Sequence, residues 1–285
     1  MTNNRDLFER FIKTAIAEDV AEGDFTSLST IPENSTVNAV IVSKDTGIIA
    51  GVKLVADIFH SLDKSIVITL NVKDGDLVYP KKQLISIEGN ARNILMMERI
   101  ALNCMQRMSG IATYTRHLTD KIIHTSTKIL DTRKTTPGMR FLEKEAVVIG
   151  GGVNHRMGLY DMIMIKDNHI DFSGGIENSI LKANQYLIDK NLNLKIEIEV
   201  RNMKELDEVL KIGKIDRIML DNFSVADLNL ALQKINKRFE TEASGGITEN
   251  NIVAYAETGV NFISVGALTH SVKNFDISLI ARKND

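Results

Sequence analysis

The sequence predicts an α/β protein in which a small, mostly antiparallel sheet precedes a larger parallel sheet. Three observations support this fold class. Residues 37–89 alternate β-branched and polar residues and contain turn dipeptides such as Asp-Gly, which is typical of antiparallel strands. From residue 128 onward, short apolar runs alternate with amphipathic helical stretches, as parallel strands joined by helical crossovers do. A long helical pattern over about residues 93–118 separates the two parts.

The composition is that of an ordinary globular protein. The 285 residues are 44% hydrophobic and 25% charged, enough for one large domain or two smaller ones. The formal net charge of -2 provides no overall field for nucleic acid or an anionic membrane, so neither partner is expected. The single cysteine, Cys104, excludes an intrachain disulfide and a thiolate metal site. No apolar stretch approaches the ~18–20 residues of a membrane span and no signal peptide is evident, so we expect a cytoplasmic protein.

The first domain is expected to cover residues 1–110. It begins with an amphipathic helix, because Leu7, Phe8 and Phe11 recur at helical spacing. A short helical run over Lys53–Leu62 interrupts the strands. The strand-like stretches themselves lie at residues 37–51, 65–79 and 83–89.

The second domain is expected to cover residues 111–266. Its predicted strands are KILDT from Lys128, MIMIKDN from Met162, KIEIEV from Lys195, RIMLDN from Arg217, FETEASGG from Phe239 and FISVGA from Phe262. Its predicted helices lie at residues 176–187, 204–210, 225–235 and 248–257. Six or so such units fit a barrel smaller than the usual eight-stranded one, and an open doubly wound sheet is the alternative. Residues 267–285 are expected to form a helix that packs back on the first domain.

Polar residues recur at the carboxyl end of the predicted strands. Barrels and open parallel sheets both bind ligands at this edge, so these residues predict a polar rim around one functional site. The residues of this rim are Asp131, Lys166-Asp167-Asn168, Glu199, Asp221-Asn222, Ser244-Gly245-Gly246 and Gly266.

The segment from Asp131 to His169 concentrates cations beside a triple glycine. Guanidinium and ammonium groups bind carboxylates and phosphates, and glycines let backbone N–H groups approach oxyanions closely. The segment therefore predicts a site for a ligand with several negative charges. The alternative is that these cations form structural ion pairs with Asp131, Glu143, Asp161 and Asp167. The cationic candidates are Arg133, Lys134, His155, Arg156 and Lys166.

Acidic residues at two neighbouring strand ends suggest a metal site. Glu197 and Glu199 lie two apart on one strand, so their side chains share a face. Glu199 and Asp221 together form a pair of hard oxygen ligands suited to Mg²⁺, which also binds substrate phosphates. A Glu–Lys pair between neighbouring strands is the equally weighted alternative.

Glycine-rich loops follow the last two predicted strands. Ser244, Gly245 and Gly246 precede a predicted helix, whose N-terminal backbone N–H groups favour phosphate, and Gly266 ends the final strand. Barrels often bind phosphate in the loops after their last strands. The residues thus indicate a phosphorylated sugar, a divalent metal and a second substrate that carries carboxylates.

Several motifs closely resemble the quinolinate phosphoribosyltransferase family, also called carboxylating nicotinate-nucleotide pyrophosphorylases. The match runs over nearly the whole chain in the expected order, and the block from DTRKT to IKDNH is highly specific. These motifs are EDVAEGDFTS, ERIALNCMQRMSGIAT, DTRKTTPG, GGGVNHRMGL, IKDNH, EIEV, LDN, ASGGI and VGALTHS.

The resemblance implies that phosphoribosyl pyrophosphate and quinolinate give nicotinate mononucleotide, pyrophosphate and CO₂ in de novo NAD biosynthesis, with Mg²⁺ as cofactor. It implies an N-terminal α/β open-faced sandwich, a C-terminal incomplete α/β barrel of six or seven parallel strands, and a homodimer, with a hexamer as the alternative. Among relatives of this fold, a molybdenum-transport-associated homologue is the nearest alternative in function. An aldolase-like barrel with a Schiff base on Lys166 and a non-enzymatic anion-binding module are more distant ones.

The resemblance also implies roles for individual residues. Lys134 would be catalytic and serve the pyrophosphate, while Glu199 and Asp221 would position the ribose hydroxyls and Mg²⁺, directly or through water. Arg99 would reach the site from the partner subunit. The remaining quinolinate ligands would be Arg133, His155, Arg156 and Lys166, and the 5′-phosphate ligands Ser244, Gly245, Gly246 and Gly266.

Overall fold

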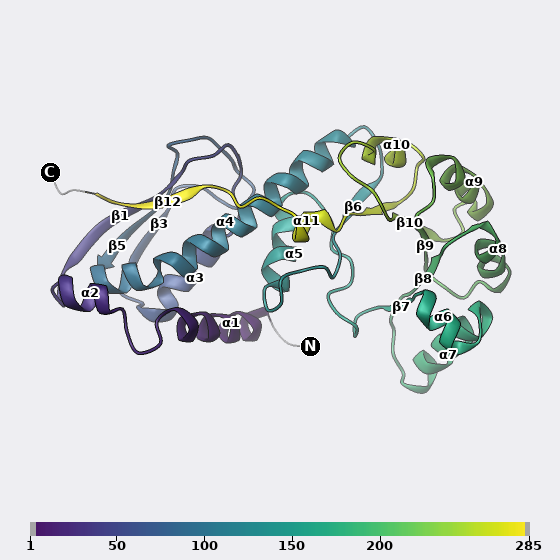
Figure 1. Ribbon diagram of the computed structural model, residues 1–285, viewed down its shortest axis with the longest axis horizontal. Helices are drawn as coiled ribbons and strands as arrows, with labels where there is room; N and C mark the ends of the chain where they lie inside the picture. Colours follow the sequence, from purple (N-terminus) through teal and green to yellow (C-terminus); the bar gives the residue numbers. More distant parts are fainter. Residues whose placement is uncertain (1–3, 283–285) are drawn as a thin grey trace. The chain divides into compact units, whose positions relative to one another are not determined.

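The computed structural model describes residues 4–282, which divide into two compact units (Figure 1). The first unit holds the described part of residues 1–116, residues 135–151 and the described part of 268–285. The second unit holds residues 117–134 and 152–267. Each unit is therefore built from separate stretches of the chain, whereas the sequence pattern suggested two consecutive domains.

The first unit contains a four-stranded antiparallel sheet in the order β12-β1-β5-β3. Its helices α3 and α4 lie along one face of this sheet (Figure 1), as in an open-faced sandwich. The strands are β1 (Thr36–Ser43), β3 (Val67–Leu70), β5 (Gln83–Asn90) and β12 (Ile277–Arg282), with β2 (Gly47–Ile48) and β4 (Leu77–Val78) as a separate pair. The helices are α1 (Asn4–Asp19), α2 (Phe25–Thr30), α3 (Val52–Leu62), α4 (Ala91–Lys121) and α5 (Arg140–Ile149).

The carboxyl-terminal segment corrects the prediction of a helix over residues 267–285. In the described part of this segment, residues 267–282, a single short helix, α11 (Ala267–His270), forms, and the chain then enters strand β12. β12 pairs antiparallel with β1 from Ser43 opposite Ile277 to Asn38 opposite Arg282. Without β12, the edge of β1 would leave backbone N–H and C=O groups unpaired. A strand at this position pairs with those groups, whereas a helix would leave them without protein partners. The segment does return to the first unit, as expected.

Helix α5 lies within the cationic segment, where the sequence analysis assigned no helix. Leu142, Ala146 and Val147 are buried and recur at helical spacing on one side of it. The sequence analysis described this segment only by its cations and by the triple glycine that follows α5. The segment from Asp131 to His169 therefore consists of a loop, helix α5, a second loop, a short strand over Ile163–Ile165 and the start of a helix at Asp167.

The second unit is built on a six-stranded parallel sheet in the order β6-β11-β10-β9-β8-β7. Helices cover the outside of the strands (Figure 1). The strands are β6 (Lys128–Leu130), β7 (Ile163–Ile165), β8 (Ile196–Val200), β9 (Arg217–Asp221), β10 (Glu240–Ser244) and β11 (Phe262–Ser264). The helices are α6 (Asp167–Ser173), α7 (Ile176–Asp189), α8 (Met203–Ile212), α9 (Val225–Ile235) and α10 (Ile252–Ala256).

This sheet confirms all six predicted parallel strands. It also confirms the prediction of an incomplete barrel, because its first and last strands do not pair with each other. β6 and β7 end the strand order, and only an isolated bridge between Leu130 and Val153 extends the sheet beyond β6 within residues 4–282. Helix α10 begins later than predicted because Thr248 and Asn251 form a turn instead, in which the Thr248 N–H donates to Asn251 Oδ1 at 2.7 Å.

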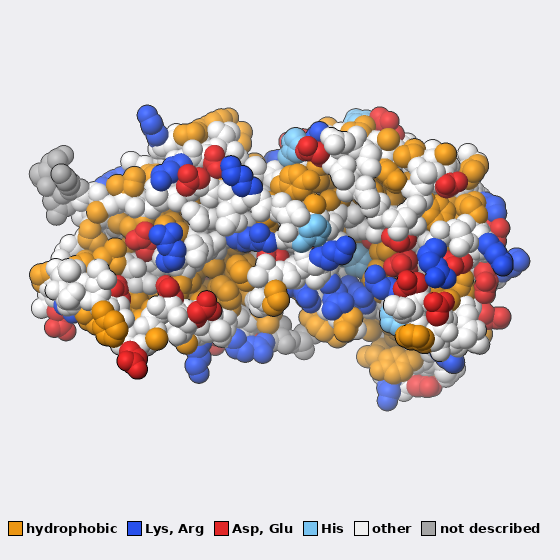
Figure 2. Space-filling view, in the orientation of Figure 1, with side chains coloured by type: hydrophobic (Ala, Val, Ile, Leu, Met, Phe, Trp, Pro, Cys, Tyr) orange, Lys and Arg blue, Asp and Glu red, His pale blue; other side chains and the backbone are white. Residues whose placement is uncertain are grey.

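The surface carries both signs of charge. Lys, Arg, Asp and Glu side chains are interspersed over the face shown in Figure 2, which agrees with the small net charge of -2. Within residues 4–282, no helix combines the length and hydrophobicity that crossing a membrane requires.

Candidate active site

The predicted polar rim lies at one edge of the parallel sheet. Because the strands are parallel, the residues at their carboxyl ends share that edge. Asp131 follows β6, Lys166 follows β7, and Asp221 and Ser244 end β9 and β10, where they are direct cross-strand neighbours. Glu199 sits near the end of β8, one residue before Val200. The fold thus brings the acids, one lysine and one glycine loop of the prediction to a common edge within the second unit.

Glu199 and Lys166 form an ion pair across neighbouring strands, with 3.3 Å between Nζ and Oε2. The lysine side chain is 45% exposed, whereas that of Glu199 is 11% exposed. Desolvation raises the pKa of Glu199; Lys166 opposes the rise and the charge of Asp221 adds to it. The Glu–Lys pair that the sequence left open is therefore present, and a second carboxylate lies close enough to repel Glu199.

The glycine loop after β10 is shaped around Asn222. Gly245 has φ +90°, and a Cβ there would lie 2.2 Å from Asn222 Oδ1 and 3.0 Å from the Asn222 backbone nitrogen. Asn222 in turn donates from Nδ2 to Asp221 at 2.6 Å and from its backbone N–H to the Ser244 carbonyl at 2.8 Å. A side chain at position 245 is thus excluded on two grounds, and the loop is locked to the end of β9.

The cations of the loops around α5 are near one another in the second unit. Arg133 and Lys134 are exposed, and Arg156 is half-buried. Desolvation lowers the pKa of Arg156, and the positive charge of Arg133 lowers it further, so the two guanidinium groups repel each other. An anionic ligand between two such cations would relieve this repulsion.

The acids proposed as structural partners of these cations accept backbone hydrogen bonds or pair with Arg107, and the charge of Asp161 also acts on Arg156. Asp131 accepts the backbone N–H of His155 at 2.9 Å, and Asp161 accepts those of Met157 and Gly158 at 2.6 and 2.9 Å. Glu143, in the first unit, pairs with Arg107 at 3.0 Å. Asp167, in the second unit, accepts the backbone N–H of Asn168 at 2.7 Å.

His155 lies inside the sheet's concave interior, with only 6% of its side chain exposed. Its Nε2 is 2.9 Å from Glu197 Oε2 and 3.4 Å from Glu242 Oε2, and both carboxylates are fully buried. Its Nδ1 accepts the backbone N–H of Arg156 at 2.7 Å. The sequence analysis placed Glu197 on this face but missed Glu242. The signal for Glu242 was the Glu-x-Glu spacing with Glu240 on β10, which repeats that of Glu197 and Glu199 on β8.

Of the two buried acids, Glu197 keeps its proton to a higher pH than a free carboxyl does. Desolvation and the charge of Glu242 raise the pKa of Glu197 to about 7. Desolvation also disfavours the charged form of Glu242, but His155 and Arg217 outweigh it and lower the pKa of that carboxyl. Desolvation lowers the pKa of His155, and its contacts with both acids outweigh this and raise the pKa to about 9.

The extra proton of this coupled cluster can reside on the imidazole or on a carboxyl. Because Nδ1 of His155 accepts an N–H, the ring carries its own proton at Nε2, and the geometry assigns the extra proton to Glu197. His155, Glu197 and Glu242 place potential ligand atoms within 4.8 Å of one another. With its proton at Nε2, the ring of His155 faces the two carboxylates at ion-pair distances rather than as a metal ligand, and the metal candidates remain Glu199 and Asp221.

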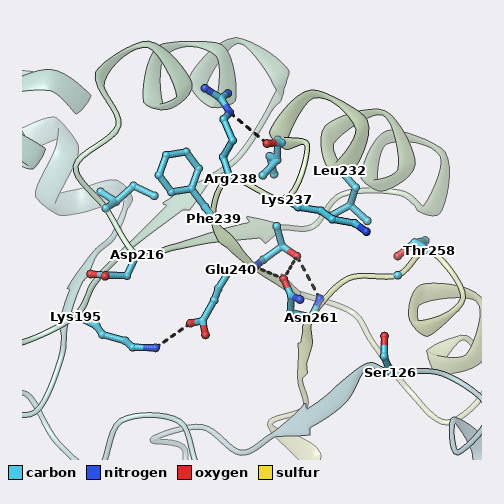
Figure 3. Close-up of a pocket in the computed structure, with 14 residues that line it drawn as sticks. Ser126, Lys195, Asp216, Leu232, Lys237, Arg238, Phe239, Glu240, Thr258 and Asn261 are labelled. Atoms are coloured by element: carbon cyan, nitrogen blue, oxygen red, sulfur yellow. Dashed lines mark hydrogen bonds and ion pairs between the residues drawn. The ribbon is translucent and has the colours of Figure 1, made fainter.

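A pocket of about 940 Å³ lies at the opposite edge of the sheet (Figure 3). Lys195, Asp216 and Asn261 each precede a strand and line it, as does Glu240 at the start of β10. Lys195 and Glu240 point toward each other there, with 3.2 Å between Nζ and Oε2. Parallel α/β sheets bind substrates at the carboxyl edge, so this pocket is separate from the candidate active site.

Two family models match the chain. The C-terminal domain of quinolinate phosphoribosyl transferase matches residues 111–280, and its N-terminal domain matches residues 24–109. The chain belongs to the quinolinate phosphoribosyl transferase family. The assignment agrees with a polar rim that combines cations, neighbouring acids and glycine loops.

Relatives and solved structures agree with this family over almost the whole chain. The chloroplastic nicotinate-nucleotide pyrophosphorylase [carboxylating] of Arabidopsis thaliana is 47% identical, covering 94% of this chain and 81% of the relative. A probable nicotinate-nucleotide pyrophosphorylase [carboxylating] of Bacillus subtilis is 44% identical, covering 97% and 94%. The structure of the Francisella tularensis nicotinate-nucleotide pyrophosphorylase superposes with a TM-score of 0.90 at 40% identity, covering 99% of this chain and 98% of that one.

The quinolinate phosphoribosyl transferase fold confirms the expected sandwich and incomplete barrel. Of the predicted site residues, all but Arg99 belong to the second unit; Arg99 is exposed on α4 in the first. Some plant relatives are named chloroplastic or mitochondrial, so a cytoplasmic location stays a prediction.

Proposed function

We propose that the protein transfers the phosphoribosyl group of phosphoribosyl pyrophosphate to quinolinate and releases pyrophosphate and CO₂, giving nicotinate mononucleotide for NAD biosynthesis. The observation that carries this proposal is the shared edge at which mutually repelling cations, a pair of neighbouring acids and a loop that requires glycine meet. Quinolinate has two carboxylates and the second substrate has several phosphate oxygens, so both need cations to be held together. The family match supports the same reaction.

Quinolinate is bound by the cations around α5 and β7. Arg133 and Arg156 repel each other in the absence of a ligand, and a carboxylate between them would form charge-assisted hydrogen bonds worth about 1.5–3 kcal/mol each. Lys166, 45% exposed, can turn from Glu199 toward a carboxylate. His155 lines the same site, with its ring held by the buried acids.

Glu199 and Asp221 fit a divalent cation. Their carboxylates repel each other, and a hard cation with oxygen ligands would remove that repulsion. Bound Mg²⁺ would supply positive charge to the pyrophosphate oxygens. The same two residues are suited to orient the ribose hydroxyls, and the loop of Ser244, Gly245 and Gly246 together with Gly266 offers backbone N–H groups to the 5′-phosphate.

Lys134 stabilises the departing pyrophosphate. The bond between ribose C1 and the pyrophosphate oxygen breaks with oxocarbenium character, and an ammonium group near the leaving oxygen stabilises the charge that develops there. The pyridine nitrogen then bonds to C1 and becomes cationic. Loss of the adjacent carboxylate as CO₂ leaves an electron pair on the ring carbon. The neighbouring cationic nitrogen stabilises this pair, and the carbon then takes up a proton from water to give nicotinate mononucleotide. Decarboxylation therefore follows transfer in this proposal; release of CO₂ before pyrophosphate would contradict that order.

The decisive assay supplies purified protein with quinolinate, phosphoribosyl pyrophosphate and Mg²⁺ and follows CO₂ and pyrophosphate. Release of both in equal amounts is the expected result. Turnover with another acceptor but not quinolinate would favour the molybdenum-transport-associated homologue. Trapping of Lys166 by borohydride with a carbonyl substrate would favour an aldolase-like enzyme, although this lysine is 45% exposed and paired with Glu199 rather than desolvated. Binding of both substrates without turnover would leave an anion-binding module.

The working form is proposed to be a homodimer, with a hexamer as the alternative, in which Arg99 reaches quinolinate in the partner subunit. Exposure of Arg99 on α4 is compatible with this role. Heterodimers of an Arg99→Ala chain and a Lys134→Ala chain should recover part of the activity, because one of their two sites keeps both residues. Isolated heterodimers without recovered activity would contradict shared sites.

A further inference from the structure

A row of alternating charges crosses the interior of the second unit. Glu240 and Glu242 lie two residues apart on β10, so their side chains share a face. Arg217, at the start of β9, pairs with both: its Nη2 is 3.1 Å from Glu240 Oε2 and its Nη1 is 3.2 Å from Glu242 Oε2. The guanidinium also lies 4.2 Å from the centre of the Phe262 ring, which limits its movement.

The row continues from Glu242 to the candidate active site. Glu242 Oε2 is 3.4 Å from His155 Nε2, and the Nδ1 on the other side of that ring accepts the N–H of Arg156 at 2.7 Å. The backbone N–H of His155 donates to Asp131 at 2.9 Å. The position of Arg156 is thus linked through one imidazole ring to Glu242 and Arg217.

The burial of this row is not explained by stability alone. The side chains of Arg217 and Glu242 are 8% and 0% exposed, and that of His155 is 6% exposed. Buried ion pairs often stabilise a fold no better than apolar residues of the same volume, because desolvation offsets their attraction. Such a row of charges does hold His155 and the backbone of Arg156, the groups nearest the candidate active site, in one arrangement.

We propose that Glu242, held by Arg217, is a positioning residue of the quinolinate site: it fixes the ring of His155 and, through that ring, the backbone at Arg156. The inference rests on the proposed function, since it concerns how that site holds quinolinate. Glu242 and Arg217 themselves touch neither substrate. Their loss acts on quinolinate more than on phosphoribosyl pyrophosphate, which binds to other strand ends.

Glu242→Gln tests the proposal against a matched control, Glu240→Gln. Both variants remove the charge of a β10 glutamate that pairs with Arg217, but only position 242 contacts His155. We expect Glu242→Gln to raise KM for quinolinate about tenfold, the effect of losing roughly one charged contact of the His155 ring, with KM for phosphoribosyl pyrophosphate within about twofold of the wild type. Glu240→Gln should leave both KM values unchanged. Equal effects of the two variants, or equal rises in both KM values, would overturn the proposal.

A double-mutant cycle tests whether Glu242 acts through His155. In a His155→Ala background, Glu242→Gln should add nothing further to KM for quinolinate, because the intermediary ring is gone. Additive effects would show that Glu242 acts by another route and would refute the inference. If Glu242→Gln fails to fold, as far-ultraviolet circular dichroism would reveal, Glu242→Asp keeps the charge but shortens the reach toward His155 and carries the same expectation.

A readout that needs no substrate separates this inference from the proposed function. Nitrogen-15 NMR of labelled histidines, with His155 assigned by its loss in His155→Ala, should show one tautomer protonated at Nε2 in the wild type and in Glu240→Gln. Glu242→Gln should shift and broaden the Nε2 signal of His155, because the ring loses one of its two carboxylate neighbours. An unchanged signal in Glu242→Gln would overturn the positioning role even if quinolinate turnover is confirmed. Absence of turnover in the wild type with the expected signals would instead refute the proposed function.

Discussion

Replacement of Gly245 by alanine should damage the candidate phosphate loop in two separable ways. The first is conformational: at φ +90° an L-residue costs about 1–2 kcal/mol relative to glycine. The second is steric: the new Cβ would meet Asn222 Oδ1 at 2.2 Å and the Asn222 backbone nitrogen at 3.0 Å. Relief of that clash requires Asn222 to move and endangers its hydrogen bonds to Asp221 and Ser244, each worth about 0.5–1.5 kcal/mol.

The two contributions together predict a loss of about 2–5 kcal/mol in the free energy of unfolding. Gly246→Ala and Gly259→Ala are matched controls, because these glycines have φ +63° and +82° but no atom within 4 Å of the added Cβ. Each should cost only the conformational part, about 1–2 kcal/mol. Gly259 lies away from the candidate active site, at the pocket of Figure 3.

Urea denaturation of the three variants measures their free energies of unfolding, and steady-state kinetics measures their KM for phosphoribosyl pyrophosphate. Gly245→Ala should raise KM for phosphoribosyl pyrophosphate, because displacement of Asn222 also releases Asp221. Gly259→Ala should leave that KM unchanged. Equal stability losses in Gly245→Ala and Gly246→Ala would refute the steric reasoning. An unchanged KM for phosphoribosyl pyrophosphate in Gly245→Ala would show that this loop does not bind the phosphate.

Three other changes test the chemistry and the charges. Lys134→Ala should lower kcat on the order of 10²-fold or more, and a change in KM alone would contradict a role in stabilising the leaving group. Folded Glu197 keeps its proton up to a pKa of about 7, whereas the unfolded chain releases it near 4.5, so the free energy of unfolding should fall as pH rises between these values, on the order of 1–3 kcal/mol. Glu197→Gln should flatten that slope in denaturation curves, and an equal slope in the variant would place the proton elsewhere. Mg²⁺ should raise the Tm of the wild type but not that of a Glu199→Gln, Asp221→Asn variant in thermal scans; equal shifts would exclude these acids as its ligands.

Much of the barrel could be predicted because its strands have a local signal. Runs such as IEIEV and RIMLD are apolar and β-branched, and each is followed by a helical pattern, so both the strands and their parallel direction follow from the order of elements. The run ETEAS carries two glutamates and is the least strand-like, yet it forms a central strand. Its charges are accommodated because Arg217 on the neighbouring strand pairs with both of them.

The carboxyl-terminal segment could not be predicted in the same way. The residues ISLIAR have no strong preference by themselves, and β12 forms because the edge of β1, more than 200 residues earlier in the chain, supplies its hydrogen-bond partners. The partners of His155 are likewise distant in sequence. Glu197 was visible as a residue on the same face as Glu199, but its proximity to Glu242 depends on how three strands lie side by side.

The sequence by itself determined the fold class, the family and the edge of the sheet at which charged and glycine residues gather, because strand periodicity and short motifs are local properties. Tertiary structure alone decided which of those residues meet: that Lys166 pairs with Glu199, that Gly245 must clear Asn222, and that the ring of His155 is turned toward buried acids. These relations depend on strand register and burial, which set distances and desolvation between residues far apart in the chain.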